Sequence, residues 1–433
     1  MQINNWLEKD LEQIKQAGLW RQMETADSFP SASRIVIDNR EMINLCSNNY
    51  LGLALHPEVK KAACDAVQEW GCGAAASRLM AGDTGLHRKL ERKIAEFKSA
   101  ESALVFPAGY MANLGIISAL LGPEDIVYTD RLNHTSIVDG LTLSRARFKR
   151  YWHNDMLHLE ELLKKDIGEE RTKKGSERIF KALEHKKEII EEERKKEEKN
   201  KEAEGRRRGE RRKIIITESV FSVDGDIAPL PDIVSLARKY NCLVMTDDAH
   251  ATGVLGLRGR GGVEYFKLEG KIDIQMGTLS KALGTQGGYV AGSRQLIDYL
   301  INKSRSFIFT TGLSPVMAAA GLKALEIIST DTSYKDKLLS NADYFRNKVT
   351  KAGFNTGQSQ TQIIPIIIGS TEKTLKFSQL LYEAGIFARA VRVPTVPLGQ
   401  ARIRISLTSQ HEKKDLDQAV EKISAIGRKL EII

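Results

Sequence analysis

The chain has 433 residues, of which 42% are hydrophobic and 28% are charged. This length can bury a large core and predicts more than one domain. No apolar run approaches the roughly 20 residues of a membrane-spanning helix, so we expect no membrane partner. The first ten residues are polar and lack the apolar region of a signal peptide, and the four cysteines form no CxxC pair. We therefore expect a cytoplasmic location and no metal site.

The formal net charge of +9 suggests a nucleic-acid partner, but its distribution argues against one. Lys164 to Lys213 contains 20 basic and 14 acidic residues, whereas the rest of the chain has 45 basic and 42 acidic residues. The excess charge therefore belongs mostly to one segment, and the remaining body is nearly balanced. We do not expect nucleic acid to be a partner.

Residues 1–50 predict an N-terminal arm. Alternating residues from 33 to 43 predict a strand, and residues 44–52 predict a polar loop that ends in glycine. An amphipathic helix precedes them, because five apolar residues fall near helical spacing. These residues are Trp6, Leu7, Leu11, Ile14 and Leu19.

Residues 51–310 alternate short apolar runs with helical segments, a pattern typical of βαβ units in a mostly parallel sheet. Polar motifs follow several predicted strands, and open α/β sheets bind ligands at the carboxyl ends of their strands. We therefore predict an α/β fold with a large domain in this region. The predicted strands are 104–106, 126–130, 148–152, 214–218, 243–246, 272–276 and 287–291.

The pattern changes after about residue 311, where longer helices precede alternating strands. The region predicts a smaller α+β C-terminal domain, over residues 311–433, with a half-exposed sheet. The predicted helices are 315–328, 335–352 and 375–384, and the predicted strands are 363–368, 388–391 and 402–407.

Two stretches indicate the chemistry. Residues 277–284 place Lys281 among small residues just after a predicted strand, as many enzymes present a lysine that attacks a carbonyl. Such a lysine must lose its proton, which a dry, positively biased pocket favours. Residues 243–253 follow an apolar strand with Asp247 and His250, three residues apart. A carboxylate in this position can keep the pyridine nitrogen of pyridoxal phosphate protonated, so that the ring accepts electrons.

Each stretch alone is also compatible with a simpler role, a surface lysine or a capping aspartate, but together they favour a pyridoxal-phosphate site. A third feature fits the same cofactor. Gly109 and Tyr110 stand at the start of an apolar helix, where free N–H groups can hold a phosphate and an aromatic ring can stack on a flat cofactor.

Seven sequence blocks stand in the order of the α-oxoamine synthase family of pyridoxal-phosphate enzymes, which the chain resembles over residues 1–163 and 214–433. The resemblance implies the fold type I of these transferases, with a large, mostly parallel sheet domain and a smaller α+β C-terminal domain. Residues 164–213 depart from it, because the family has a much shorter connection there. The blocks are 47–52, 131–134, 153–155, 220–226, 246–253, 278–281 and 393–397.

The resemblance also implies a role for each matching residue. Lys281 would bond to the cofactor and later act as a base, Asp247 would pair with the ring nitrogen, and His250 would contact the ring hydroxyl. His134 would stack on the ring, contact substrate and complete the catalytic set. The remaining cofactor contacts would come from Gly109, Tyr110, Ser222 and Thr278.

The substrate contacts implied by the resemblance are Arg21, Arg392 and Thr395, with the arginines as bidentate partners of carboxylates. The implied reaction is an acyl transfer. The Cα atom of an amino acid attacks an acyl thioester, carried by CoA or acyl carrier protein, the thiol leaves and CO2 is lost. The family further implies a homodimer.

Two branches of the family remain open. The residues around Arg78, Tyr110 and Lys281 favour the branch that joins L-alanine to a pimeloyl thioester in biotin biosynthesis. The alternative branch joins glycine to acetyl-CoA and tends to have a glycine before the lysine, where this chain has Ser280. A scaffold without activity is a third reading, which the intact Lys281, Asp247 and His250 argue against.

The segment Lys164–Lys213 predicts a surface excursion outside the active site. Its apolar residues stop at Ile190, apart from Ala203, so most of it cannot bury a core. Its composition fits either a solvated helix or disorder. The cluster Arg206–Lys213 leaves open a contact with RNA or with an acidic partner such as a carrier protein.

Overall fold

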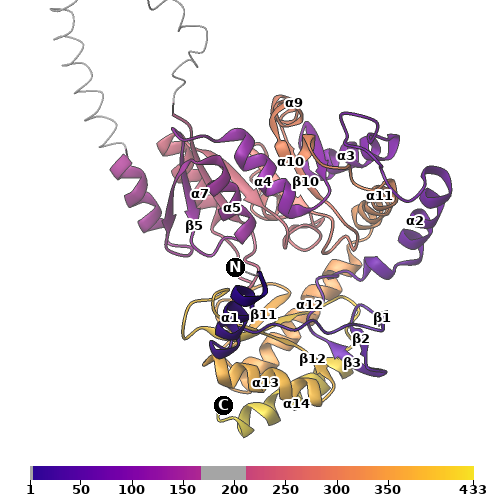
Figure 1. The fold of residues 1–433 in the computed structure, drawn as a ribbon, viewed down its shortest axis with the longest axis vertical. Coiled ribbons are helices and arrows are strands. Elements are labelled where there is room, and N and C mark those ends of the chain that lie inside the picture. Colours follow the sequence, from indigo (N-terminus) through magenta and orange to yellow (C-terminus); the bar gives the residue numbers. More distant parts are fainter. Residues whose placement is uncertain (1–2, 167–210) are drawn as a thin grey trace, which may run out of the picture.

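Two parts of the molecule are stacked in the computed structural model, which describes residues 3–166 and 211–433 (Figure 1). The upper part of the view contains the large sheet and its helices, and the lower part contains α1, the C-terminus and two smaller sheets. Residues 167–210, which make up most of the expected surface excursion, lie outside the described residues. That expectation therefore stays a prediction.

A seven-stranded sheet forms the centre of the upper part, in the order β4-β10-β9-β8-β7-β5-β6. The strands from β6 to β9 pair in parallel, whereas β10 runs antiparallel to both its neighbours, so the predicted mostly parallel sheet is confirmed. β9 begins two residues later than predicted and extends to Thr278. The strands are β4 (Ser102–Phe106), β5 (Ile126–Asp130), β6 (Arg147–Tyr151), β7 (Lys213–Glu218), β8 (Leu243–Asp247), β9 (Ile274–Thr278) and β10 (Gly288–Gly292).

The central strands face two separate hydrophobic cores, because successive side chains of a strand point to opposite faces. Ile214 and Ile216 of β7 pack with residues of α4, α5 and α9, whereas Ile215 packs with residues of α7. Burial on both faces explains the continuous apolar runs in the sequence. The helices here are α2 (Pro57–Trp70), α3 (Gly85–Lys98), α4 (Gly109–Leu120), α5 (Thr135–Ser144), α7 (Leu230–Tyr240), α8 (Gly262–Tyr265), α9 (Arg294–Lys303), α10 (Arg305–Ile308) and α11 (Pro315–Thr330), with a 3-10 turn η1 (Leu53–Leu55) and a further helix over 156–166.

The N-terminal strands join the lower part. The run predicted as one strand over 33–43 is a hairpin, because Asp38 and Asn39 adopt positive φ and turn the chain back. A four-stranded sheet has the order β1-β2-β3-β12, and an antiparallel sheet has the order β11-β14-β13. The strands are β1 (Ser28–Ser31), β2 (Arg34–Ile37), β3 (Arg40–Asn44), β11 (Ile363–Gly369), β12 (Ile386–Phe387), β13 (Arg389–Val391) and β14 (Ala401–Ser406).

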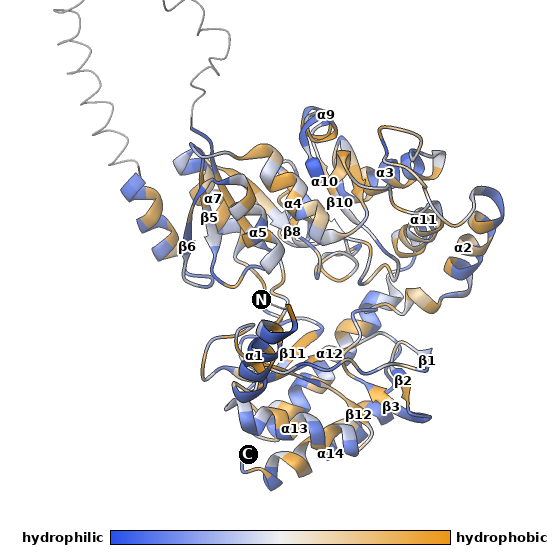
Figure 2. Cartoon of the chain, in the orientation of Figure 1, coloured by the Kyte–Doolittle hydropathy of each residue, from blue (hydrophilic) through white to orange (hydrophobic). Residues whose placement is uncertain are grey.

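Helices α12 (Ser333–Lys351), α13 (Thr371–Glu383) and α14 (Lys413–Lys429) complete the lower part. Apolar and polar residues share the surfaces of α13 and α14 (Figure 2). The sequence analysis did not identify α14, although Leu416, Ala419 and Ile423 follow helical spacing and are buried. The predicted first helix is present as α1 (Ile3–Gln16), but none of its residues is buried.

The domain boundaries predicted at residues 50 and 310 stay a prediction. α11 follows the second boundary but packs against α2 and α3, and β3 precedes the first boundary but pairs with β12.

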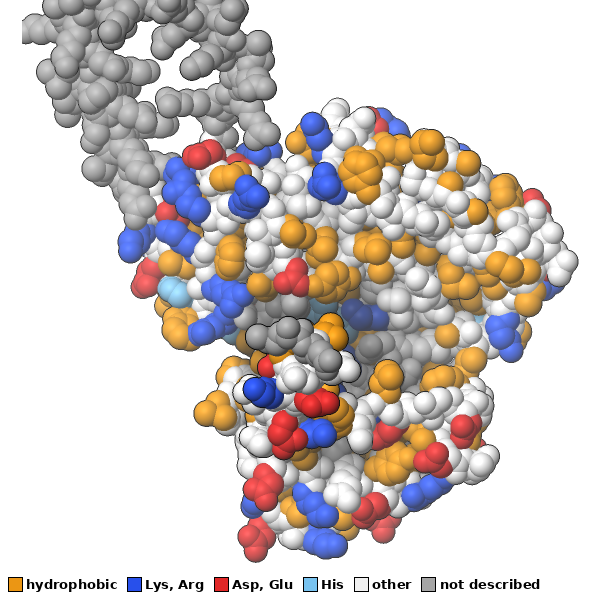
Figure 3. Space-filling model, viewed as in Figure 1, with side chains coloured by type: hydrophobic (Ala, Val, Ile, Leu, Met, Phe, Trp, Pro, Cys, Tyr) orange, Lys and Arg blue, Asp and Glu red, His pale blue; other side chains and the backbone are white. Residues whose placement is uncertain are grey.

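Within the described residues, no helix has the length and apolarity that crossing a membrane requires. Acidic and basic side chains are interspersed over the lower part of the surface (Figure 3).

Candidate active site

Asp247 ends β8 inside the protein and is fixed by two hydrogen bonds. Its Oδ1 accepts from the backbone N–H of Ala249 at 2.9 Å, and its Oδ2 accepts from Nδ2 of Asn113 in α4 at 2.8 Å. The same Nδ2 donates to Oγ of Ser136 in α5 at 2.9 Å. Helix α4 thus holds this carboxylate at the carboxyl end of the sheet, and α5 fixes the amide that binds it.

His134 caps the N-terminus of α5. Its Nδ1 accepts from the backbone N–H of Ser136 at 3.2 Å and lies 2.8 Å from the Ser136 Oγ. Burial lowers the pKa of His134; Asp247 opposes this effect and Lys281 adds to it. The ring is therefore neutral at neutral pH, close to both Asp247 and Lys281.

Lys281 lies in the turn that follows β9 and is partly buried. Burial lowers the pKa of its amino group, Asp247 and Glu218 act to raise it, and Arg404 acts to lower it. A lowered pKa increases the unprotonated fraction, which is the form that attacks a carbonyl or removes a proton. The structure thus brings Lys281, Asp247 and His134 together.

His250 follows Asp247 in a buried turn and contacts Tyr50. Its Nδ1 lies 2.7 Å from the Tyr50 hydroxyl, and its carbonyl accepts from Nε2 of Gln362 at 3.1 Å. Burial holds the pKa of His250 well below its usual range, and the charges of Lys281 and Arg404 lower it further. His250 is therefore a neutral ring close to Lys281.

Glu218 was not selected from the sequence, yet it lies beside Asp247. It ends β7 and is the register partner of Asp247 on β8. Its Oε1 accepts from the backbone N–H of His134 at 2.6 Å. Burial and the charge of Asp247 raise its pKa to about 8. A glutamate at the end of an apolar strand was the available signal, but the strand order was needed to place it.

The N-terminus of α4 begins at Gly109, beside Thr278. A Cβ on Gly109 would lie 3.3 Å from Cβ and Oγ1 of Thr278, so this position favours the absence of a side chain. The N-cap, Ala108, provides no side-chain cap, which leaves the first N–H groups of the helix available to an anion. Tyr110 is exposed, and its hydroxyl bonds to the carboxylate of Asp139.

Ser222 lies in the turn after β7 and is fixed by Arg404 of β14. The Arg404 Nε donates to the Ser222 carbonyl at 2.5 Å, and a guanidinium N–H donates to Oγ of Ser406 at 2.6 Å. Arg402 bonds to the carboxylate of Asp224 in the same turn. Arg404 was not selected from the sequence, because only the tertiary structure brings β14 to this turn.

Three predicted substrate residues make their described contacts with other segments. Arg21 and Thr395 are exposed. The backbone N–H of Thr395 donates to the carbonyl of Arg392 at 2.9 Å. Arg392 is buried and donates to the carbonyl of Trp20 at 3.0 Å, which brings it close to the segment that carries Arg21. Its Nε has no hydrogen-bond partner among the described residues.

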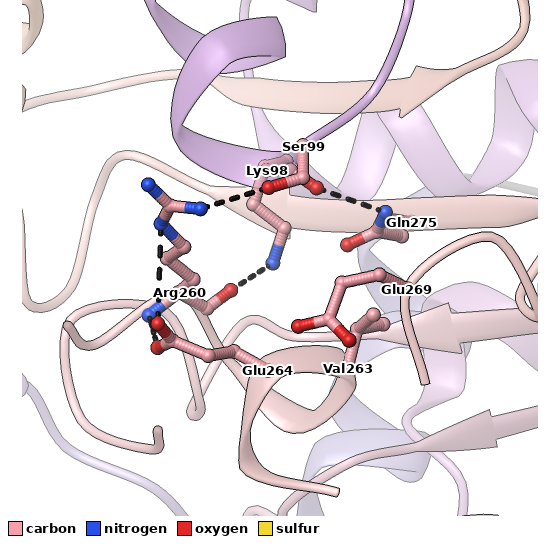
Figure 4. A pocket seen from close by; sticks show the side chains of 7 residues that line it. All are labelled: Lys98, Ser99, Arg260, Val263, Glu264, Glu269 and Gln275. Carbon is pink, nitrogen blue, oxygen red and sulfur yellow. Dashed lines mark hydrogen bonds and ion pairs between the residues drawn. The ribbon is translucent and has the colours of Figure 1, made fainter. Parts of the chain in front are cut away.

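Asp248, next to Asp247, makes a different set of contacts. Its Oδ2 accepts from Nζ of Lys98 at 2.5 Å, and both side chains are fully buried. Nζ of Lys98 also donates to the carbonyl of Arg260 at 2.5 Å, beside a small polar pocket (Figure 4). This ion pair anchors the end of β8 to α3, which supports the position of Asp247.

Solved structures share this fold. A serine palmitoyltransferase from S. paucimobilis, with PLP and myriocin bound, matches with a TM-score of 0.84 and 27% identity over 99% of this chain and 98% of its own. An 8-amino-7-oxononanoate synthase from Francisella tularensis matches with a TM-score of 0.70 and 26% identity, over 90% of this chain and 99% of its own. The predicted fold, fold type I of the pyridoxal-phosphate-dependent transferases, is confirmed.

Curated relatives match over nearly the whole chain. The 8-amino-7-oxononanoate synthase of Thermoanaerobacter pseudethanolicus is 45% identical over 429 residues, 99% of this chain and 98% of the relative. That of Symbiobacterium thermophilum is 43% identical over 433 residues, all of both chains. The profile of aminotransferase class I and II matches residues 40–423. The chain therefore belongs to the aminotransferase class I and II family.

Proposed function

We propose that the protein is a pyridoxal-phosphate-dependent acyltransferase that condenses L-alanine with a pimeloyl thioester. The products would be 8-amino-7-oxononanoate, the free thiol and CO2, as a step of biotin biosynthesis. The observation that carries the proposal is the partly buried Lys281, with its lowered pKa, in one cluster with Asp247, His134 and His250. The names of full-length relatives more than 40% identical support the choice of substrates.

The residues present fit the cofactor. The open N-terminus of α4 at Gly109, with Tyr110, Ser222 and Thr278, would hold its phosphate and other oxygens. Asp247, fixed by Asn113, would face its ring nitrogen. When bound, pyridoxal phosphate supplies an electron sink for the electrons left by a broken bond at Cα.

The protein side of the reaction follows from the cluster. Lys281 would hold the cofactor covalently and, once released, take the Cα proton of the amino acid, which its lowered pKa favours. His134 and His250 are neutral, so their rings can lie against a cofactor without adding charge. Glu218 can carry a proton near neutral pH beside Asp247, because its pKa is about 8.

The proposed substrate contacts are Arg21, Arg392, Thr395 and His134. The unpartnered Nε of the buried Arg392 supports a carboxylate ligand, because a buried guanidinium N–H without an acceptor is costly. A pimeloyl chain and an amino acid each carry a carboxylate. The acyl carrier, CoA or acyl carrier protein, stays open.

The cofactor assignment has a direct chemical test. Borohydride reduction of the protein with bound pyridoxal phosphate, followed by peptide mass mapping, should place the adduct on Lys281. An adduct on another lysine would refute the assignment.

The substrate assignment is tested by a matrix of assays. L-alanine and glycine are each paired with pimeloyl-CoA and acetyl-CoA, and thiol release is followed. We expect the highest kcat/KM for alanine with pimeloyl-CoA. A preference for glycine with acetyl-CoA would instead identify a glycine C-acetyltransferase.

We also propose a cytoplasmic homodimer. Sedimentation at working concentration tests the assembly, and a fully active monomer would contradict it.

The excursion over 164–213 is proposed to be dispensable for turnover. It returns through Arg212 to the amino end of β7, whereas Glu218 lies at the carboxyl end of the same strand. Asp166 is buried and accepts from Tyr128 and Lys149, so the deletion must spare it. Replacing residues 167–210 by a short Gly-Ser bridge should keep kcat and KM for a CoA thioester within about twofold.

A further inference from the structure

His153 lies between two carboxylates that belong to different segments of the chain. Its Nδ1 is 3.1 Å from Oδ1 of Asp130, the last residue of β5, and its Nε2 is 2.8 Å from Oδ2 of Asp226. Both ring nitrogens can donate at once only when the imidazole is protonated. The ring also packs perpendicular to Phe221, with 4.4 Å between centroids.

The charge state of His153 follows from these neighbours. Burial acts to lower the pKa of the imidazole, but the hydrogen bonds and charges of Asp130 and Asp226 outweigh burial and raise the pKa to about 10. These two carboxylates, one on β5 and one on the turn after β7, are the charged groups that act on the ring. The imidazole ring is therefore positively charged at neutral pH and bridges the two carboxylates; we call this contact the His153 bridge.

Asp130 connects the bridge to His134. Its Oδ1 also accepts from the backbone N–H of Leu132 at 2.8 Å, and its carbonyl accepts from the N–H of Asn133 at 3.2 Å. Asn133 in turn donates to the carbonyl of Ile216 at 2.8 Å. Hydrogen bonds thus fix the short segment from Asp130 to His134, and His153 binds its first residue.

Asp226 connects the bridge to Ser222. Its carbonyl accepts from the N–H of Phe221 at 3.1 Å, which closes the turn that contains Ser222. Its Oδ2 accepts from Nδ2 of Asn154 at 2.8 Å as well as from His153. Its Oδ1 is buried without a hydrogen-bond partner among the described residues, so its charge depends on the contacts of the other oxygen.

We propose that His153 is a positioning residue. As an imidazolium it ties the segment 130–134, which carries His134, to the turn 221–226, which carries Ser222, and so fixes these two residues relative to each other. The inference rests on the proposed function in one respect, that His134 and Ser222 contact the cofactor. Without the cation, two poorly solvated carboxylates would face one another and push the loops apart.

Three variants test the bridge. His153→Gln removes the cation, and Asp226→Asn removes the negative charge of one partner while the Asp130 contact remains. His158→Gln is the matched control, because His158 lies five residues away and accepts from the N–H of Trp152, with no hydrogen bond to either carboxylate. Circular dichroism and thermal unfolding establish that each variant is folded.

Hydrogen exchange measures the coupling without any cofactor. His153→Gln should speed amide exchange in both 130–134 and 221–226, Asp226→Asn should do so only in 221–226, and His158→Gln should change neither. Absorbance titration of cofactor-free protein with pyridoxal phosphate should show affinity reduced about tenfold or more in His153→Gln, as for other residues that orient direct ligands. For His153→Gln, unchanged affinity, or faster exchange in only one of the two segments, would overturn the proposal.

NMR of protein with labelled histidine measures the charge itself and keeps the test valid if His153→Gln fails to fold. The His153 ring should remain protonated from pH 6 to 9, and titration near the ordinary histidine pKa would overturn the proposal. A wild-type protein that takes up no pyridoxal phosphate would refute the proposed function instead, because the exchange and NMR results would still decide whether the bridge exists.

Discussion

The two ends of the seven-stranded sheet gather different kinds of residue. Glu218, Asp247 and Lys281 meet at or just beyond the carboxyl ends of β7, β8 and β9, and the pKa values of Glu218 and Lys281 are shifted. At the amino ends of these strands lies a cavity of about 440 Å³. Apolar side chains form much of its lining, namely Leu120, Leu121, Ile214, Leu243, Ile272, Ile274 and Leu296.

The contrast shows that volume alone does not mark the functional end. Arg212 and Asp273 also line the cavity, but Arg212 is already paired with Asp125 at 2.8 Å, and Oδ2 of Asp273 accepts from the N–H of Val244 at 2.8 Å. The carboxyl end instead holds an amino group whose environment favours its reactive form. Strand β8 connects the two ends: Leu243 at its start lines the cavity, and Asp247 at its end lies in the candidate site.

The largest effect is expected from Lys281→Ala. Loss of Lys281 would remove both the proposed covalent partner of the cofactor and the proposed base, so turnover should fall by at least about a thousandfold. Steady-state assays with alanine and pimeloyl-CoA measure it, with Lys303→Ala on the exposed end of α9 as control. Activity within tenfold of wild type would remove Lys281 from the chemistry.

Asp247→Asn should give the next largest effect. The amide keeps the size of the side chain but removes the charge that would hold the ring nitrogen protonated, so we expect turnover to fall about a hundredfold or more. Exchange of the Cα proton of alanine in D2O measures the step directly, and thermal unfolding checks the fold. Near-normal exchange is the result that would contradict this role.

Leu243→Ala tests the opposite end of the same strand. Leu243 is 41% exposed, so truncation should cost less than the ~2–5 kcal/mol of a buried leucine, about 1 kcal/mol of unfolding free energy. Turnover should stay within twofold, because the site lies at the other end of β8. A larger loss of turnover than of stability would show that the cavity is coupled to the site.

His411 should have the smallest effect on turnover, because its titration takes place in the lower part of the molecule. Its Nδ1 accepts from the N–H of Thr408 at 3.0 Å and its Nε2 lies 3.2 Å from the carbonyl of Asn44. Burial lowers its pKa to about 4, below the value of about 6.5 in the unfolded chain. Its contribution to stability is therefore fully present above pH 6.5 and is lost as the pH falls towards 4.

Denaturant unfolding between pH 7.5 and 4.5 measures this contribution. The unfolding free energy of wild type should fall more steeply with decreasing pH than that of His411→Gln, while turnover at pH 7.5 should be similar. Parallel pH profiles would contradict the assignment. A steeper fall in wild type would show that a lowered histidine pKa can serve the fold, as for His411, whereas that of His250 belongs to the candidate site.

The sequence alone determined most elements and pointed to the central residues of the candidate site. Apolar runs bounded by turns predicted the strands of the large sheet, because strands buried on both faces need side chains that are apolar without interruption. Lys281 and Asp247 were found because each stands next to the strand that positions it. These are local patterns, which a single stretch of chain contains in full.

Other features depend on contacts between distant segments. Glu218 lies beside Asp247 only because β7 pairs with β8, and Arg404 reaches the turn of Ser222 only because β14 is brought there from the lower part. The hairpin over 34–44 was missed because two residues with positive φ, not glycines, turn the chain. His153 shows the same principle, since its three-residue block gives no sign of the two carboxylates that fix its charge. Which charges meet, and hence which pKa values shift, was decided by strand order and loop packing, because electrostatic interactions depend on distance in space and not on separation in sequence.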